Sequence, residues 1–485
     1  MAATTIVWFR QDLRLGDNPA LSAAVETAGG DGVVPVFIWA PDEEKPFAPG
    51  GASRVWLHGS LAALDESLRA KGSRLVLRVG STRDALLAIA KETGARAVFW
   101  NRRYEPVVAR RDAEVARALE AAGIATHPER ALPSANLLFE PEALTTAAGG
   151  RFQRFGAFWR AMQDAPSPAA PRPAPRSLPA PSRWPSSQKL EALELLPRIP
   201  WDREIRSVWT PGESAARAHL RDFVRKRLDA YGERRDRVDT TPTSRLSPHL
   251  HFGEIGARDV WHAVQEVAAR GEIEAEPFLR ELAWRELAYH VLHHLPRTTT
   301  ESMQPLFRRF PWAHDRSGLR AWQRGETGYP LVDAGMRELW ATGYLPNRAR
   351  LVVASFLVKH LLLPWQKGAA WFWDTLVDAD LANNTLNWQW CAGSGVDAAP
   401  YFRIFNPVIQ GQTYDPEGTY VRRWLPELAK VPLRYLHAPW TAPAEVLREA
   451  GVGLGRTYPN PIVDHQMARA RALAAFEEAR RGGVG

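Results

Sequence analysis

The stretch VDADLANNTLNWQWCAGSGVDAAPYFRIFNP, residues 377–407, decides how the second half of the chain folds. It places two aspartates, three asparagines and two tryptophans within about a dozen residues, from Asp378 to Trp390. Asp380 is a favourable N-cap, and neither glycine nor proline follows it until Gly393. The pattern therefore predicts a helix that begins directly after Asp380.

On this helix the amides and indoles fall on two faces. Asn384 and Trp388 are one turn apart and share a face, whereas Trp390 lies on another. Such a helix suits a position between a cofactor and a substrate. The alternative is a tryptophan-rich buried helix whose amides are satisfied by backbone groups, and the spacing alone leaves both interpretations open.

The composition limits the class of protein. The 485 residues are enough for two or three domains. With 62 Lys and Arg against 54 Asp and Glu, the formal charge is +8 and the isoelectric point about 9.7. This excess is compatible with a polyanionic partner, although spread over a large surface it can serve solubility alone.

Cysteine content and hydropathy exclude several classes. Cys391 is the only cysteine, so disulfide frameworks and thiolate zinc sites are excluded and a reducing compartment is expected. The apolar run near the N-terminus is too short for a signal-peptide core, and no run approaches the roughly 18 residues of a membrane span. We expect a cytoplasmic protein with no membrane association.

The N-terminal part alternates strand and helix patterns. Apolar runs predict buried strands at residues 6–9, 33–39, 75–79 and 97–100, and helical spacing occurs at residues 53–70, 82–93 and 106–122. This alternation predicts an α/β domain over residues 1–130 with a doubly wound, Rossmann-like parallel sheet. Residues 10–14 and 101–105 would follow strands and are candidate binding loops, although neither is a Gly-rich phosphate cradle.

The remainder is predicted to be a connector and a helical domain. Residues 131–208 form the connector, and its part at 164–185 is too proline-rich for helix or internal strand. Residues 209–485 are expected to form an all-helical domain. Its helices are expected at residues 213–231, 257–270, 277–295, 329–342, 346–363 and 367–378, with a basic helix and frayed tail at 469–485.

Three polar clusters in the helical part have both functional and ordinary explanations. Residues 243–247 supply three hydroxyls and a guanidinium, which can surround a pyrophosphate or merely cap the next helix. Glu281, Trp284 and Arg285 share a helix face that is either a nucleotide groove or a solvated surface. The His-rich segments at 249–251 and 290–294 lack a carboxylate at a known metal spacing, so no metal is predicted.

Three long motifs resemble those of the photolyase and cryptochrome flavoprotein family. They are VWFRQDLRLGDN at residues 7–18, TGYPLVDAGM at 327–336, and residues 378–407. The resemblance covers nearly the whole chain. It implies an N-terminal antenna domain and a C-terminal helical FAD-binding domain.

The resemblance also implies a set of cofactor-binding residues. A bent FAD, active in its reduced anionic form, would be held by Tyr231, Thr243, Ser244, Arg245, Leu246, Ser247, Arg285, Asn347, Arg350, Asp378, Asp380 and Asn384. Arg350 and Asp378 are expected to pair beside the flavin ring. Asn384 is expected to face flavin N5, where an amide, unlike a carboxylic acid, does not readily deliver a proton.

Catalytic and substrate residues follow by the same motifs. Trp388, Trp365 and Trp312 match the family's electron chain that re-reduces flavin in light, and Trp371 and Trp373 offer a side branch. The lesion and its DNA backbone would contact Arg235, Glu281, Trp284, Arg285, Asn347, Arg348, Leu351, Trp390, Arg403 and Gln410. A flipped cyclobutane dimer would enter between the aromatic walls and be split by an electron from the flavin, which then returns.

Departures from the family pattern refine this prediction. Leu351 replaces the usual methionine at similar volume, so repair is expected to survive. Relatives that repair the other major photoproduct carry histidines at the positions of Asn347 and Leu351, which argues against that substrate. Segments 41–56 and 423–428 look most like plant cryptochromes and class III photolyases, whereas plant cryptochromes generally carry aspartate at the Asn384 position and a long C-terminal tail.

We therefore predict an enzyme, a class III deoxyribodipyrimidine photo-lyase acting on UV-damaged DNA as a monomer without an obligate protein partner. The alternative is a blue-light signalling cryptochrome, and a third is a DNA-binding flavoprotein without photochemistry. Val107 and Val108 replace the polar pair of the usual bacterial folate pocket. A second chromophore, methenyltetrahydrofolate bound near Glu43 and Trp56, or alternatively a deazaflavin, is expected.

Overall fold

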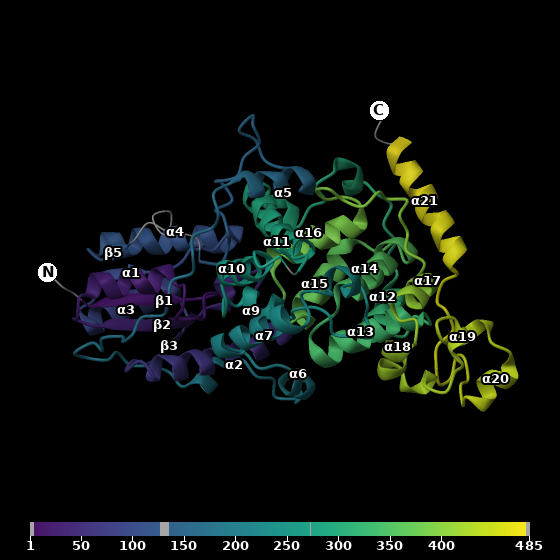
Figure 1. Ribbon diagram of the computed structural model, residues 1–485, viewed down its shortest axis with the longest axis horizontal. Helices are drawn as coiled ribbons and strands as arrows, with labels where there is room; N and C mark the ends of the chain where they lie inside the picture. The colour runs from purple at the N-terminus through teal and green to yellow at the C-terminus, as the bar shows by residue number, and fades with distance from the viewer. Residues whose placement is uncertain (1–3, 127–134, 272, 482–485) are drawn as a thin grey trace. The chain divides into compact units, whose positions relative to one another are not determined.

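The computed structural model describes residues 4–126, 135–271 and 273–481 (Figure 1). The chain divides into two compact units. The first unit comprises Met1–Asp229, Ser244–Pro296 and Val377–Ala382. The second comprises Ala230–Thr243, Arg297–Leu376 and Asn383–Gly485. The FAD-related residues predicted from sequence are divided between the two units, which are described separately below.

A parallel sheet forms the N-terminal part of the first unit, as predicted. Its strands are β1 (Thr5–Phe9), β2 (Val33–Trp39), β3 (Val76–Val79), β4 (Ala97–Phe99) and β5 (Ala125–Thr126), in the order β3-β2-β1-β4-β5. All neighbouring strands run parallel, with Val7 opposite Pro35 on one side and Phe99 on the other. Buried strand residues pack against helices in one apolar core. Because the strands run parallel, each connection must cross over from one end of the sheet to the other, usually through a helix.

Four helices connect these strands: α1 (Pro19–Ala28), α2 (Gly51–Arg69), α3 (Thr82–Thr93) and α4 (Pro106–Ala121). The last three agree with the predicted helices to within two residues. The sequence interpretation missed α1, although Asn18 caps it by accepting from the Leu21 N–H and Gly29 ends it at a φ of +61°. A short 3-10 helix, η1 (Pro41–Glu44), follows β2.

The rest of the first unit is helical or extended. Its helices are α5 (Phe155–Asp164), η3 (Leu190–Leu193), α6 (Arg203–Val208), α7 (Glu213–Lys226), α9 (Ser247–His251), α10 (Ala257–Ala268) and α11 (Glu276–His294). Residues 166–185 contain neither helix nor strand, in agreement with their proline content. The central helix α11 is buried along most of its length.

The second unit is helical. Its elements are α8 (Tyr231–Arg234), η5 (Pro305–Arg308), α12 (Arg316–Arg324), α13 (Pro330–Thr342), α14 (Asn347–Ser355), η6 (Phe356–His360), α15 (Trp365–Thr375), α17 (Pro407–Tyr414), α18 (Thr419–Trp424), η7 (Pro426–Leu428), α19 (Leu433–Leu436), η8 (Pro439–Thr441), α20 (Ala444–Glu449) and α21 (His465–Arg481). The 3-10 helix η4 (Pro296–Thr299) and the helix α16 (Leu381–Ala392) each have residues in both units. The α/β plus all-α fold class is confirmed.

Two predicted helices differ from the structure: the helix expected at residues 213–231 ends at Lys226, and the helix expected at residues 346–363 is interrupted. Residues 346–363 were expected to form a single helix, but α14 passes into the π-helical segment η6 before the chain turns at Leu362, whose φ is +52°. A π-helical turn inserts a residue into the helix and is often found at functional sites. The predicted tail at residues 482–485 lies outside the described residues.

Candidate active site

In the first unit, Asp380 lies in a buried polar cluster. Tyr289 on α11 donates its hydroxyl hydrogen to Asp380 Oδ2, and His251 Nδ1 lies 3.6 Å from the same oxygen. Burial favours the neutral acid, but His251, Arg285 and Tyr289 outweigh it and hold the pKa of Asp380 well below its ordinary value. Asp380 is therefore an ionised carboxylate immediately before α16.

Helix α11 presents the other predicted residues of this unit. Arg285 is buried, donates to the Asn136 carbonyl at 2.7 Å, and lies over the Tyr289 ring at 5.0 Å. Trp284 is half-buried and stacks on Phe155 with ring centroids 4.0 Å apart. The half-buried Glu281 lies one turn before Arg285 on the same helix face.

The segment before α9 adopts a constrained turn. Arg245 has a φ of +53°, a left-handed conformation that is costly for a residue with a side chain. The Ser244 hydroxyl accepts from the Leu246 N–H at 3.3 Å, and the Arg245 guanidinium lies over Trp209 at 4.1 Å. α9 then begins at Ser247. The turn gathers hydroxyl groups and a cation, as an anion-binding segment requires.

The predicted helix of the opening stretch is present as α16, which begins at Leu381 directly after Asp380, and its residues from Asn383 onward belong to the second unit. Asn384 is half-buried and donates from Nδ2 to the Ala369 carbonyl on α15 at 3.0 Å. This bond fixes the amide, because the nitrogen is engaged and the oxygen remains as the acceptor.

Trp388 packs against α15 at a position that only glycine permits. A Cβ on Gly368 would overlap the indole of Trp388. Trp365 lies one turn before Gly368 on α15, so these two residues share a helix face. Trp388 packs against that face at Gly368. Trp388 is 2% exposed, and its Nε1 has no acceptor among the described residues.

The other two tryptophans of the predicted chain have different surroundings. Trp365 is fully buried and donates from Nε1 to the Ser302 hydroxyl at 3.1 Å. Trp312 is half-buried and packs on Phe310 with ring centroids 4.5 Å apart. The indoles of Trp388 and Trp365 are therefore more deeply buried than that of Trp312. The arrangement is compatible with a relay from the interior toward solvent.

The beginning of α14 carries four predicted residues. Asn347 is exposed as its first residue, while Arg348 is ion-paired with Asp236 and lies over the Tyr414 ring at 4.3 Å. Arg350 donates from Nε to the Leu345 carbonyl at 2.8 Å, and Leu351 is half-buried. The pairing of Arg350 with Asp378 stays a prediction, because these residues belong to different units.

The remaining predicted residues of this unit are placed as follows. Tyr231 is buried, with the Arg235 guanidinium 5.5 Å from its ring centre. Trp390, Gln410 and Thr243 are half-buried. Arg403 is exposed, with its guanidinium 5.7 Å from the Phe405 ring centre. It is therefore accessible to a phosphate.

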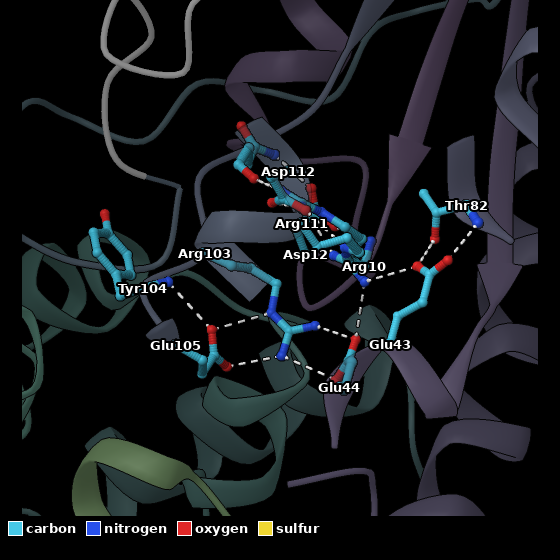
Figure 2. Close-up of polar contacts among 11 residues, drawn as sticks. Arg10, Asp12, Glu43, Glu44, Thr82, Arg103, Tyr104, Glu105, Arg111 and Asp112 are labelled. Carbon is cyan, nitrogen blue, oxygen red and sulfur yellow. Dashed lines mark hydrogen bonds and ion pairs between the residues drawn. The ribbon is translucent and has the colours of Figure 1, made fainter. Parts of the chain in front are cut away.

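The two predicted antenna residues are not brought to one cavity. Glu43 accepts from the Thr82 N–H at 2.9 Å and from its hydroxyl at 2.6 Å (Figure 2). It lines a cavity of about 700 Å³ with Ser81, Arg83, Val107, Arg110, Arg111, Glu114, Val115, Arg117 and Ala118. Trp56 is instead 1% exposed, bonded to Glu254 at 3.1 Å and packed on Trp209.

Sequence reasoning missed several supporting residues. Tyr289 and His251, which hold Asp380, come from separate helices, and the Ala369 carbonyl that orients Asn384 carries no side-chain signal. Gly368 was detectable only as a glycine inside a helix, a position that often marks close approach.

Within the described ranges, no three His, Cys, Asp or Glu side chains gather as metal ligands, and no helix is long and apolar enough to cross a membrane.

Comparisons with known proteins agree with this architecture. Residues 5–176 match the model of DNA photolyase, and residues 278–478 match that of the FAD binding domain of DNA photolyase. A deoxyribodipyrimidine photo-lyase of Agrobacterium fabrum is 48% identical over 482 residues, covering 99% of this chain and 98% of that protein. Cryptochrome-2 of Arabidopsis thaliana is 43% identical, covering 99% of this chain and 80% of that protein.

A solved structure gives the same result in three dimensions. The crystal structure of a bacterial class III photolyase from Agrobacterium tumefaciens superposes with a TM-score of 0.94 at 48% identity, covering 99% of this chain and 98% of that one. Two matched domain models and relatives of this similarity over nearly the whole length establish the conclusion. The chain belongs to the photolyase and cryptochrome family of flavoproteins.

Proposed function

We propose that the protein repairs cyclobutane pyrimidine dimers in DNA by light-driven electron transfer, as a deoxyribodipyrimidine photo-lyase. The observation that carries this choice is Asn384, an amide whose nitrogen is held by the Ala369 carbonyl. Its oxygen is an acceptor for an N–H group and has no proton to give. This chemistry favours a reduced anionic flavin, which repair requires, over the protonated form that a carboxylic acid would promote.

The residues present fit FAD. The Ser244–Ser247 turn provides hydroxyls and the Arg245 cation for a pyrophosphate, and its left-handed Arg245 supports a functional role for the strained backbone. Arg285 adds a second cation, which is buried. We assign the remaining contacts to Tyr231, Thr243, Asn347, Arg350, Asp378, Asp380 and Asn384. When bound, reduced and excited by light, the flavin would supply the electron that opens the cyclobutane ring. The electron then returns to the flavin.

We assign the supply of electrons for photoreduction to Trp388, Trp365 and Trp312. Support comes from Trp388 packing on the α15 face that Trp365 shares. The indole N–H of Trp388 has no acceptor among the described residues. The exclusion of water from the first two indoles protects a transient radical from side reactions.

The lesion is proposed to be held by the aromatic side chains Trp284 and Trp390, together with Glu281, Asn347 and Leu351. Stacking platforms of this kind accept unstacked bases whatever their sequence, and a damaged dimer is the least costly to extrude. Arg235, Arg403 and Gln410 are proposed to contact the DNA backbone. Arg348 would join them only by sharing its guanidinium with Asp236.

We propose that a second chromophore binds in the cavity beside Glu43. The Glu43 carboxylate, fixed by Thr82, is an acceptor for the N–H edge of a pterin. Arg83, Arg110 and Arg117 line the same cavity and would meet an acidic tail. This chemistry matches methenyltetrahydrofolate, whereas Trp56, buried and bonded to Glu254, is no longer assigned to the site.

The test exposes the purified, photoreduced protein to UV-irradiated oligothymidylate under blue light and in the dark. Repair restores the ultraviolet absorbance of thymine only in the light, and we expect this result with the protein as a monomer. The competing signalling function would give light-dependent oligomerisation or partner binding without restored absorbance. That outcome would overturn the proposal.

A further inference from the structure

The loop between α16 and α17, residues 393–406, carries one of the proposed DNA contacts. Residues 393–396 form its first arm, and residues 398–403 form its second arm. Arg403 and the neighbouring Phe402 are both exposed at the end of the second arm. The groups that hold this loop therefore decide where the guanidinium of Arg403 lies.

The backbone of the loop follows a constrained path. Asp397, between the arms, has a φ of +45°, a left-handed conformation that is costly for a residue with a side chain. Gly393 has a φ of +81°, and a Cβ at this position would lie 3.4 Å from the Ala399 carbonyl oxygen and 3.5 Å from the Tyr401 Cα. The chain thus folds back until the two arms lie against each other. Such a path persists only where surrounding contacts fix it.

The first arm is held by Gln389, a buried residue of α16. Its backbone carbonyl accepts from the N–H of Ser394 at 2.9 Å and from the N–H of Gly395 at 3.2 Å. Its side-chain oxygen accepts from the Ser394 hydroxyl at 3.3 Å, and the Ser394 carbonyl accepts from the Gln304 N–H at 3.0 Å. Uncharged groups make all of these bonds, so the position of the first arm does not depend on pH through them.

Lys359, in the π-helical segment η6, joins the two ends of the loop. Its Nζ donates to the Ala392 carbonyl at 3.4 Å, where α16 ends, and to the Tyr401 carbonyl at 3.2 Å. The same Nζ lies 3.4 Å from the centre of the Tyr401 ring. Because the Tyr401 carbonyl belongs to the peptide that leads into Phe402, this bond sets the direction in which the chain continues to Arg403.

The Tyr401 side chain is itself fixed, so it gives the lysine a rigid partner. It is buried, stacks on Phe476 of α21 with ring centroids 4.6 Å apart, and packs against Phe307 and Phe310. An ammonium that donates to carbonyls and lies over an aromatic face is held more strongly than a neutral amine in the same place. Protonation of Lys359 therefore tightens the contact between η6 and the second arm.

The groups around Lys359 do not titrate together with it. Burial lowers the pKa of Lys359 to about 7, although Cys391 acts in the opposite direction. Burial raises the pKa of Cys391 to about 12 and that of Tyr401 above its ordinary value, so both side chains stay neutral near pH 7. The titratable side chains of α21 with described contacts to η6 reach the neighbouring His360 instead, and they are Arg471 and His465.

We propose that Lys359 is a positioning residue for DNA binding, which holds both ends of the 393–406 loop and so places Arg403 against the DNA backbone. Arg403 makes the contact, whereas the buried Lys359 acts through the loop. Affinity for DNA is then highest while Lys359 is protonated. The inference rests on the proposed function in naming DNA as the ligand. Binding is measured in the dark, so its outcome is distinguishable from a failure of light-driven repair.

The first measurement compares the FAD-loaded wild-type protein with K359M at constant ionic strength. Fluorescence anisotropy gives the Kd for an oligonucleotide carrying one cyclobutane thymine dimer, in the dark. We expect K359M to bind about fivefold more weakly at pH 6, roughly the effect of losing one hydrogen bond. By pH 8.5 the wild-type lysine is neutral, and the two Kd values should agree to within about twofold. Equal affinities at pH 6, or a ratio that does not change with pH, would overturn the inference.

The variant K359R separates positioning from folding. Arginine keeps a cation that does not titrate in this range, so K359R should bind as tightly as the wild-type protein at pH 6 and keep that affinity at pH 8.5. K367M removes an exposed lysine of α15 and should follow the wild-type protein at both pH values. If K359M does not retain FAD, K359R decides: fivefold weaker binding by folded K359R at pH 6 would contradict the inference.

A double-mutant cycle with R403A tests the route through the loop, and its single variant at an exposed position does not disturb the core. R403A should lose the part of the pH dependence that Lys359 confers, and adding K359M to R403A should weaken binding no further. A further fivefold loss in the double variant, or an unchanged pH dependence in R403A, would show that Lys359 acts elsewhere.

Repair kinetics at pH 6 provide the last check. K359M should raise KM about fivefold and leave kcat unchanged, because Lys359 places the DNA and takes no part in electron transfer. A lower kcat with an unchanged KM would contradict the proposed role.

Discussion

Asn384 is the residue on which the choice between repair and signalling depends. Its nitrogen is bonded to the Ala369 carbonyl, so its orientation is set by a neighbouring helix rather than by the cofactor. Asn387 lies three residues further on α16, is exposed, and donates to the Asn383 carbonyl. The same helix therefore offers a half-buried amide at the proposed site and a matched amide in solvent.

Replacing Asn384 by aspartate tests this role. A carboxylic acid at this position can protonate the flavin, so we expect photoreduction to stop before the fully reduced state and repair to slow by about tenfold or more. Flavin absorbance during illumination and the rate of dimer repair measure the two effects. The N387D variant is the control and should match the wild-type protein. Equal behaviour of N384D and the wild-type protein would exclude the role.

Lys359 is a buried side chain that has no carboxylate partner among the described residues of the second unit. It is 1% exposed, donates to the Tyr401 carbonyl at 3.2 Å and the Ala392 carbonyl at 3.4 Å, and lies over the Tyr401 ring. Burial lowers its pKa to about 7, although the nearby Cys391 acts in the opposite direction. The side chain joins the last residue of α16 to the segment that carries Arg403.

This burial makes stability depend on pH. The unfolded chain keeps Lys359 protonated up to its ordinary pKa of 10.5, whereas the folded protein releases the proton near pH 7. The unfolded state thus binds more protons, and the free energy of unfolding should rise by about 1.5 kcal/mol between pH 7 and about 8.5 from this residue. Denaturant unfolding should show the rise in the wild-type protein and in K367M, an exposed control. A rise of the same size in K359M would contradict the assignment.

At the scale of elements, the contact between α15 and α16 supports the proposed electron relay. Gly368 admits the indole of Trp388 against the face that carries Trp365. We expect W388F to lose photoreduction while chemically reduced W388F still repairs, because the relay serves flavin reduction and not ring opening. W159F, which alters a buried tryptophan of α5, should photoreduce normally. Normal photoreduction of W388F would show that the relay is not used.

Elements with strong local signals were predictable. α16 begins at Leu381, directly after Asp380 as predicted, and the four longest strands follow apolar runs of the right length. The helix over residues 346–363 was wrong in detail because its π-helical end depends on distant groups. Lys359 reaches carbonyls 33 and 42 positions away, and such a bond has no local signature.

The sequence proposes residues for the site, but it does not identify the groups that hold them in place. Motifs of the family name Asn384 and Asp380, yet the groups that orient them, the Ala369 carbonyl and the side chains of Tyr289 and His251, come from other helices. Trp56 illustrates the opposite error. It lies near Glu43 in sequence, but its helix turns the indole into the core against Trp209.

For the whole molecule, the account combines a helical FAD-binding part with an α/β part that contains the cavity beside Glu43. The net charge of +8 suits a DNA substrate without specifying one. The relative named deoxyribodipyrimidine photo-lyase is 48% identical and covered over 98% of its length, whereas Cryptochrome-2 is 43% identical and covered over 80%, so the comparisons support repair over signalling. The chemistry on damaged DNA tests this choice directly.

The most direct test of the central claim is therefore repair of a single defined lesion. An oligonucleotide carrying one cyclobutane thymine dimer is mixed with chemically reduced protein, illuminated with blue light or kept dark, and analysed by chromatography. We predict complete conversion of the dimer to two intact thymines in the light, with many turnovers per enzyme and none in the dark. An unchanged dimer after illumination of fully reduced, DNA-bound protein would contradict the account.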